Sequence, residues 1–158
     1  MSIPLAYIEA LISKRLAMVP SRHFRTVSHH IAAVLSSRNI TGYNYMAPTT
    51  RPSIHAEMDL VNKLPYHRGR LQSIDILSLR ASWGGEHRSA RPCWHCLQYL
   101  HKQGRQKGYS IKNIFYSTGS GIRVEKLSAM LIATHHHISY GRSQRSLTNS
   151  PPSPSLRL

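Results

Sequence analysis

The chain has 158 residues, a length typical of one domain with a short additional segment. Its 21 lysine and arginine residues outnumber 6 aspartate and glutamate residues, which gives a formal net charge of +15. The sequence contains no apolar run long enough for a transmembrane helix. Its two cysteines could form at most one disulfide bond within the chain, which is too few for a secreted protein of this size that depends on disulfides. The charge is typical of proteins that bind nucleotides or nucleic acids, but charge alone does not identify a reaction.

The first residues do not have the pattern of a secretory signal. They lack a positive start, an unbroken apolar centre and a small-residue cleavage site, and they include Glu9. We therefore expect a cytoplasmic protein with no membrane partner, and the strong positive charge keeps the nucleus open as an alternative location.

The first half of the chain predicts a helix, a hairpin and a second helix. Residues 3–17 place apolar side chains at helical spacing and are expected to form an amphipathic helix that ends before Pro20. Two β-prone runs, Ile31–Leu35 and Ile40–Tyr45, flank four polar residues and predict a hairpin. A short helix is expected near His55–Leu64, where Pro65 stops it.

The second half of the chain alternates strands and helices. In chain order we expect a strand over Ile74–Ala81, a loop over Ser82–Arg91, a helix over about Cys93–Gln103, strands over Ile111–Tyr116 and Ile122–Lys126, and a short helix over Leu127–Thr134. About five strands interleaved with helices indicate an α/β fold. We divide the chain into an N-terminal helix and linker (1–29), the α/β domain (30–140) and a disordered basic tail rich in serine and proline (141–158).

The residue types that carry chemistry lie in two short motifs. The first is His55-Ala56-Glu57 and the second is Pro92-Cys93-Trp94-His95-Cys96, which contains both cysteines of the chain. A histidine and two thiolates make three zinc ligands, one fewer than a structural site needs, so the fourth position is left for water, as in a catalytic site. Both motifs fall at predicted helix starts, where the positive end of the helix dipole favours anionic ligands.

Glu57 is the candidate catalytic residue. It follows the histidine by two positions, is not needed as a ligand, and is placed to take a proton from the activated water and pass it to a substrate.

The pattern H-x-E followed by P-C-x-x-C resembles the signature of the cytidine and deoxycytidylate deaminase superfamily of zinc deaminases. The resemblance covers about residues 30–116 and implies a three-layer α-β-α domain, in which two zinc-ligand helices pack on one face of a five-stranded mixed sheet. It implies that His55, Cys93 and Cys96 hold zinc. Hydroxide would then attack C4 of a cytosine-type nucleoside or nucleotide, ammonia would leave, and Glu57 would shuttle the protons. It also implies a homo-oligomer.

The same resemblance points to substrate contacts. Asn44, in the segment Gly42-Tyr43-Asn44, would present its side chain to the sugar and base, and the backbone N–H of Ala56 would hold the pyrimidine carbonyl. The loop over residues 89–92 would meet the exocyclic amine. Arg88 and Arg91 lie next to the expected active-site mouth and are candidate phosphate contacts.

Several alternatives stay open at this stage. The zinc site could be structural, with His95 as a fourth ligand, or the domain could be a non-catalytic zinc-stabilised module that binds nucleic acid or protein. The substrate could be a base within RNA or single-stranded DNA, or a ring other than cytosine, such as an amino-purine or a pterin. We expect Trp94 to pack in the core or an interface rather than stack on a base. We also expect His135, His136 and His137 to bind no second metal.

Overall fold

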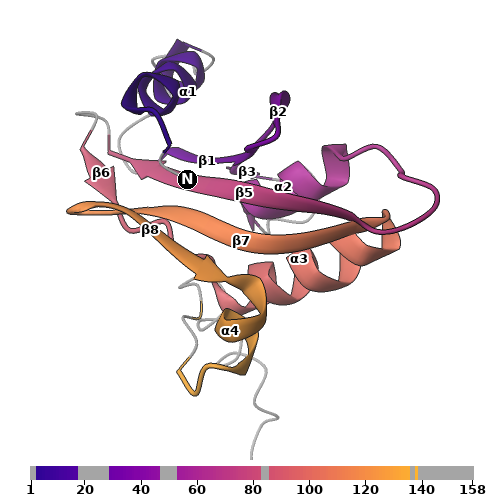
Figure 1. Cartoon of the computed structure of the whole chain (residues 1–158). Helices are drawn as coiled ribbons and strands as arrows, with labels where there is room; N and C mark the ends of the chain where they lie inside the picture. Colours follow the sequence, from indigo (N-terminus) through magenta and orange to yellow (C-terminus); the bar gives the residue numbers. More distant parts are fainter. Residues whose placement is uncertain (1–2, 18–28, 47–52, 83–85, 136–137, 139–158) are drawn as a thin grey trace, which may run out of the picture.

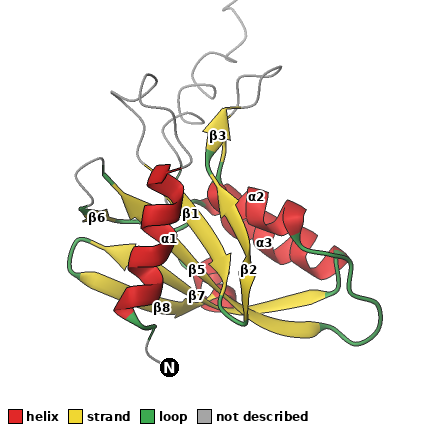
Figure 2. Ribbon diagram, turned by 90° about the horizontal axis from the view of Figure 1, so that it is seen from above, coloured by secondary structure: helices red, strands yellow, loops and turns green. Residues whose placement is uncertain are grey.

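The computed structural model places a mixed β-sheet between helices (Figures 1 and 2). It describes residues 3–17, 29–46, 53–82, 86–135 and 138. The elements in chain order are α1 (Leu5–Ala17), β1 (His29–Val34), β2 (Ser37–Tyr43), β3 (Tyr45–Met46), β4 (Ser53–Ile54), α2 (Ala56–Lys63), β5 (Gln72–Ala81), β6 (His87–Arg88), α3 (Trp94–Gln106), β7 (Tyr109–Thr118), β8 (Gly121–Lys126) and α4 (Leu127–Ile132).

The main sheet has the strand order β2-β1-β5-β7-β8, with the two-residue β6 paired to β5. Neighbouring strands are antiparallel except for β5 and β7, which are parallel. Parallel neighbours need a crossover connection, and α3 supplies it. The strands β3 and β4 form a separate small pair that leads into α2.

Both faces of the central strands carry buried apolar residues, and helices pack on each face. On one face Ile74 and Ile76 of β5 are buried in a cluster with residues of α2, α3 and α4. On the other face Leu77 and Leu79 are buried with Ile8 of α1. Figure 1 shows α1 on the opposite side of the sheet from α3. These three layers confirm the predicted α/β fold, with a five-stranded mixed sheet to which β6 adds a short sixth strand.

Several predicted boundaries were wrong, and the loop predicted over Ser82–Arg91 contains the short strand β6. The polar stretch in the hairpin is shorter than expected, because β2 already begins at Ser37. The helix α3 continues to Gln106, past the predicted end at about Gln103, so Gly104 lies within it. Gly104 is buried, and a Cβ there would lie 3.2 Å from Cδ1 of Ile111, so this glycine gives the helix close contact with β7. Gly108, with a φ of 90°, follows the helix end instead.

Several predictions concern residues that the structure does not describe, including the tail over 141–158 and the pair His136 and His137. Among the residues that it does describe, no helix is both long and apolar enough to cross a membrane.

Candidate metal and catalytic site

The two predicted ligand motifs meet at the starts of α2 and α3, which lie side by side on one face of the sheet (Figure 2). His55 is the N-cap residue of α2 and Cys93 is the N-cap residue of α3. An N-cap side chain usually accepts a hydrogen bond from its own helix, but neither of these side chains does so. They turn toward each other instead, and Cys96 joins them from the first turn of α3.

The three side chains are close enough to share one metal ion. Nδ1 of His55 lies 3.6 Å from Sγ of Cys93 and 3.3 Å from Sγ of Cys96, and all three atoms lie within 4.8 Å of one another. A tetrahedral zinc ion with ordinary bond lengths would separate its nitrogen and sulfur ligands by about 3.5 Å. Both the donor types and their spacing therefore fit zinc, and the group can bind a metal ion.

The thiols are poised for metal binding. A hydrogen bond from the Cys96 thiol lowers the pKa of Cys93 to about 3, despite the opposing effect of burial. The same hydrogen bond, together with burial, raises the pKa of Cys96. One of the two cysteines is therefore a thiolate at neutral pH, the form in which cysteine binds metals.

Glu57 lies against this group and is sealed from solvent. Its side chain is 1% exposed. Sγ of Cys96 lies 3.5 Å from Oε2 of Glu57, and the Ser78 hydroxyl donates a hydrogen bond to Oε1 at 2.9 Å. The two carboxylate oxygens thus have different surroundings, since Oε2 faces the ligand group and Oε1 faces the sheet.

The structure adds two residues that the sequence did not single out, Ser78 on β5 and His30 on β1. Nε2 of His30 lies 3.3 Å from the Ser78 hydroxyl and 3.6 Å from Oε1 of Glu57. Burial lowers the pKa of His30, outweighing the nearby Glu57 carboxylate, so its imidazole is neutral at pH 7. Ser78 could have been noticed as a polar residue within an otherwise apolar strand face, whereas nothing local marks His30.

A buried hydrogen bond joins the end of β2 to α2, and Asn44 directly follows β2. The buried carboxylate of Asp59 accepts a hydrogen bond from the Tyr43 backbone at 2.9 Å and pairs with Lys63 at 2.6 Å. One residue later, Oδ1 of Asn44 accepts a hydrogen bond from the backbone N–H of His30 at 2.9 Å, which fixes the amide side chain. Asn44 is therefore held next to His30, although its substrate contact stays a prediction.

The other predicted substrate contacts are Ala56, Arg88 and Arg91. Ala56 is buried and is the first residue of α2, where a backbone N–H has no partner within its own helix. Arg88 is exposed on β6. Arg91 forms an ion pair with Glu125 of β8 at 3.4 Å, so a phosphate would have to share this guanidinium with a carboxylate. Phosphate binding by Arg88 and Arg91 stays a prediction.

The ion pair of Arg91 predicts a pH effect on stability. Burial would raise the pKa of Glu125, but hydrogen bonds from Tyr116 and Arg91 outweigh it and lower that pKa. A carboxyl group whose pKa is lowered by folding stabilises the fold above its unfolded pKa of about 4.3 and loses this effect as the pH falls through the folded-state value. We expect Glu125→Gln to lower the melting temperature by about 1–4 °C near pH 7.

That difference should shrink as the pH falls below about 4.3, because the carboxyl group of the unmodified chain becomes neutral as well. Thermal melts of both proteins at a series of pH values would measure it. Glu9→Gln, at an exposed position of α1, is the matched control. A gap between Glu125→Gln and the unmodified chain that stayed constant down to acid pH would contradict the assignment.

His95, His135 and Trp94, all within the described part of the chain, lie outside the ligand group. Among the described residues, the atoms that could hold one ion are those of His55, Cys93 and Cys96, and His95 is not among them. His135 is exposed. Trp94 packs against the core cluster beneath α3, as expected, but it is only partly buried, so part of its side chain remains accessible.

No family model matches the sequence, and no curated protein sequence matches it. Solved structures that are similar in fold include two cytidine deaminases. One is a cytidine deaminase from Mycobacterium leprae, with 22% identity and a TM-score of 0.44 over 79% of this chain and 93% of that chain. The other is a cytidine deaminase from Mycobacterium tuberculosis, with 18% identity and a TM-score of 0.46 over 85% of this chain and 99% of that chain. Similarity at this level does not identify a reaction, so the function proposed below rests on this chain's own residues.

Proposed function

We propose that the protein is a zinc-dependent hydrolytic deaminase that acts on a cytosine-type nucleoside or nucleotide. One observation carries the proposal: a sealed carboxylate, Glu57, lies 3.5 Å from a sulfur atom of a three-residue ligand group. A structural zinc site would use four protein ligands and would have no need of an acid beside it. Three ligands and an adjacent acid are the parts that hydrolysis requires.

Zinc held by His55, Cys93 and Cys96 would supply a water molecule activated near neutral pH. The chain's own residues would then transfer the protons. Oε1 of Glu57 already accepts a hydrogen bond from Ser78, so Oε2, which faces the ligand group, is the oxygen that would transfer protons. It would take one proton from the water and pass it to the ring nitrogen, and then take the second proton of that water and pass it to the leaving amine. Ser78 keeps the carboxylate in one orientation throughout.

Two residues are the proposed substrate contacts. Asn44 is fixed by His30 at the end of β2, and the N–H of Ala56 lies at the start of α2 beside Glu57. Together they would hold a ring by its sugar side and its carbonyl. The buried walls would exclude other water from the reaction.

A substrate panel tests the proposal. Zinc-loaded protein would be incubated with cytidine, deoxycytidine, their monophosphates, amino-purines and a pterin, and loss of the amine would be followed by mass spectrometry. We expect turnover of at least one cytosine compound, loss of that turnover on chelation, and recovery on addition of zinc. Turnover of a purine or pterin alone would contradict the cytosine assignment, and no turnover of any ring would contradict the deaminase itself.

A further inference from the structure

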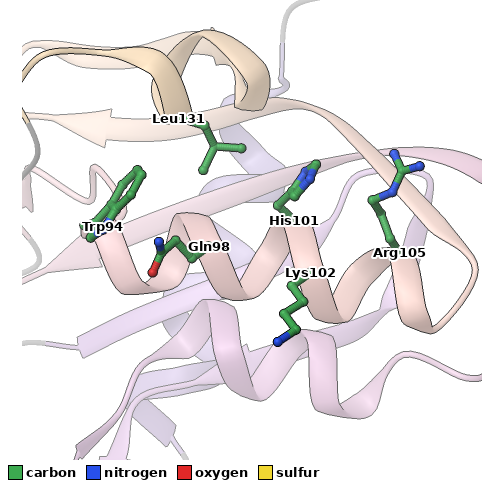
Figure 3. Close-up of a pocket in the computed structure, with 6 residues that line it drawn as sticks. All are labelled: Trp94, Gln98, His101, Lys102, Arg105 and Leu131. Atoms are coloured by element: carbon green, nitrogen blue, oxygen red, sulfur yellow. The ribbon is translucent and has the colours of Figure 1, made fainter.

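A second surface feature, outside the ligand group, is a groove of about 680 Å³ between α3 and α4 (Figure 3). Five of its residues come from α3, and each lies three or four positions from another of them, so they lie along one side of the helix. Leu131 of α4 forms the opposite wall. The lining residues from α3 are Trp94, Gln98, His101, Lys102 and Arg105.

The groove is basic and carries no acidic side chain. Lys102 and Arg105 are exposed, and neither takes part in the ion pairs formed among the described residues, which join Lys63 to Asp59 and Arg91 to Glu125. Two fixed positive charges that are not neutralised by neighbours favour an anionic ligand.

An aromatic side chain lies at the end of the groove nearest the metal ligands. Trp94 directly follows Cys93, and Figure 3 shows its indole ring at one end of the row and Arg105 at the other. They are eleven positions apart on the helix, which corresponds to about 16 Å. That distance is several times the spacing of about 3.4 Å between successive nucleotides of a stacked strand.

We propose that this groove binds single-stranded nucleic acid. Lys102 and Arg105 contact successive phosphates, and Trp94 offers a stacking surface for a base, which is the usual combination of side chains in single-strand binding sites. The inference goes beyond the proposed function, because none of these residues belongs to the ligand group or to the acid. A variant can therefore lose strand binding and keep deamination, or lose deamination and keep strand binding.

The groove could also be occupied by another part of the same chain or by a second copy of it, and charge argues against both. The segment 139–158 contains three arginines and no acidic side chain, so it would meet the groove with like charge. A second copy would bring the same +15 charge and, in a symmetric contact, the same basic helix.

The test compares two charge-reversed variants of the zinc-loaded, full-length chain. The first is Lys102→Glu with Arg105→Glu. The control is Lys14→Glu with Lys112→Glu, which changes the net charge equally at two exposed positions outside the groove. Binding of a fluorescein-labelled single strand of roughly 12 nucleotides, within the known range of single-strand site sizes, would be followed by anisotropy over a salt series, with RNA and DNA strands of one sequence.

The groove variant is expected to bind at least about tenfold more weakly near 50 mM salt, and its slope of log affinity against log salt should fall by about 1.4, because two phosphate contacts are lost. The control should keep most of the affinity. Equal losses in the two variants would mean attraction by net charge only and would overturn the proposal. Equal affinity for a mononucleotide and the strand would overturn it too.

Trp94 supplies a second readout that needs no charge reversal. The chain has two tryptophans, so Trp83→Phe leaves Trp94 as its only indole. Its fluorescence should be quenched when the strand binds and should recover with added salt. An unchanged signal at saturating strand would overturn the proposal. So would a groove variant that changed oligomeric state in sedimentation while strand affinity stayed constant.

Discussion

Glu57→Gln is expected to lower kcat for deamination by a factor of about 10²–10⁴, the usual contribution of general acid–base catalysis. The amide keeps the shape of the side chain and can still accept the Ser78 hydrogen bond that holds Oε1. It cannot take a proton from water or return one to the ring. The loss should therefore appear in kcat, with KM changed little.

The measurement needs proof that the variant still folds and holds its metal. Thermal melting and metal content would be compared with those of the unmodified protein, and Glu9→Gln, on the exposed side of α1, serves as the matched substitution. Retained turnover in Glu57→Gln with full metal content would show that another group moves the proton. Lost metal would instead show that Glu57 supports the ligand group.

Gly42→Ala is expected to destabilise the protein by about 3 kcal/mol or more, at or beyond the upper end of the usual cost of overpacking. A Cβ on Gly42 would lie 2.2 Å from the backbone oxygen of Ala56 and 2.3 Å from the backbone nitrogen of Leu60. Both atoms belong to α2, so the clash cannot be relieved by turning a side chain. For a chain of this length the melting temperature should fall by about 6–12 °C.

The same substitution should also damage the site. Relief of the clash would push α2 away from β2, and α2 begins immediately after His55 and carries Glu57. Zinc affinity and turnover would then fall together. Gly119→Ala is the control, because a Cβ at Gly119 meets nothing within 4 Å, and its melting temperature should stay nearly unchanged. Equal effects of the two substitutions would contradict the close approach of β2 and α2.

The sequence predicted the order of the main elements because each carries a strong local pattern. The strand over Ile74–Ala81 and the helix after Pro92 both lie where periodicity and proline place them. Gly104 was misjudged because a glycine near a helix end usually signals the exit. Its actual role, contact with Ile111 on β7, depends on tertiary packing that spacing along the chain does not encode.

The ligand group was predictable because its members form compact motifs, and the structure brings His55, Cys93 and Cys96 together. The residues around Glu57 were not predictable in the same way. His30 and Ser78 are 48 positions apart and meet because β1 and β5 are neighbours in the sheet. No local spacing rule connects two strands whose pairing is decided by the whole fold.

The position of α1 has a consequence for the protein in solution. Ile8 and Leu11 cover the sheet face that bears Leu77 and Phe115, whereas the ligand group lies on the other face. Undocking of α1 would expose a broad apolar strand surface to other molecules and invite aggregation. Solubility and chemistry thus depend on opposite faces of one sheet, and a defect in α1 would first become visible as precipitation rather than as an altered reaction.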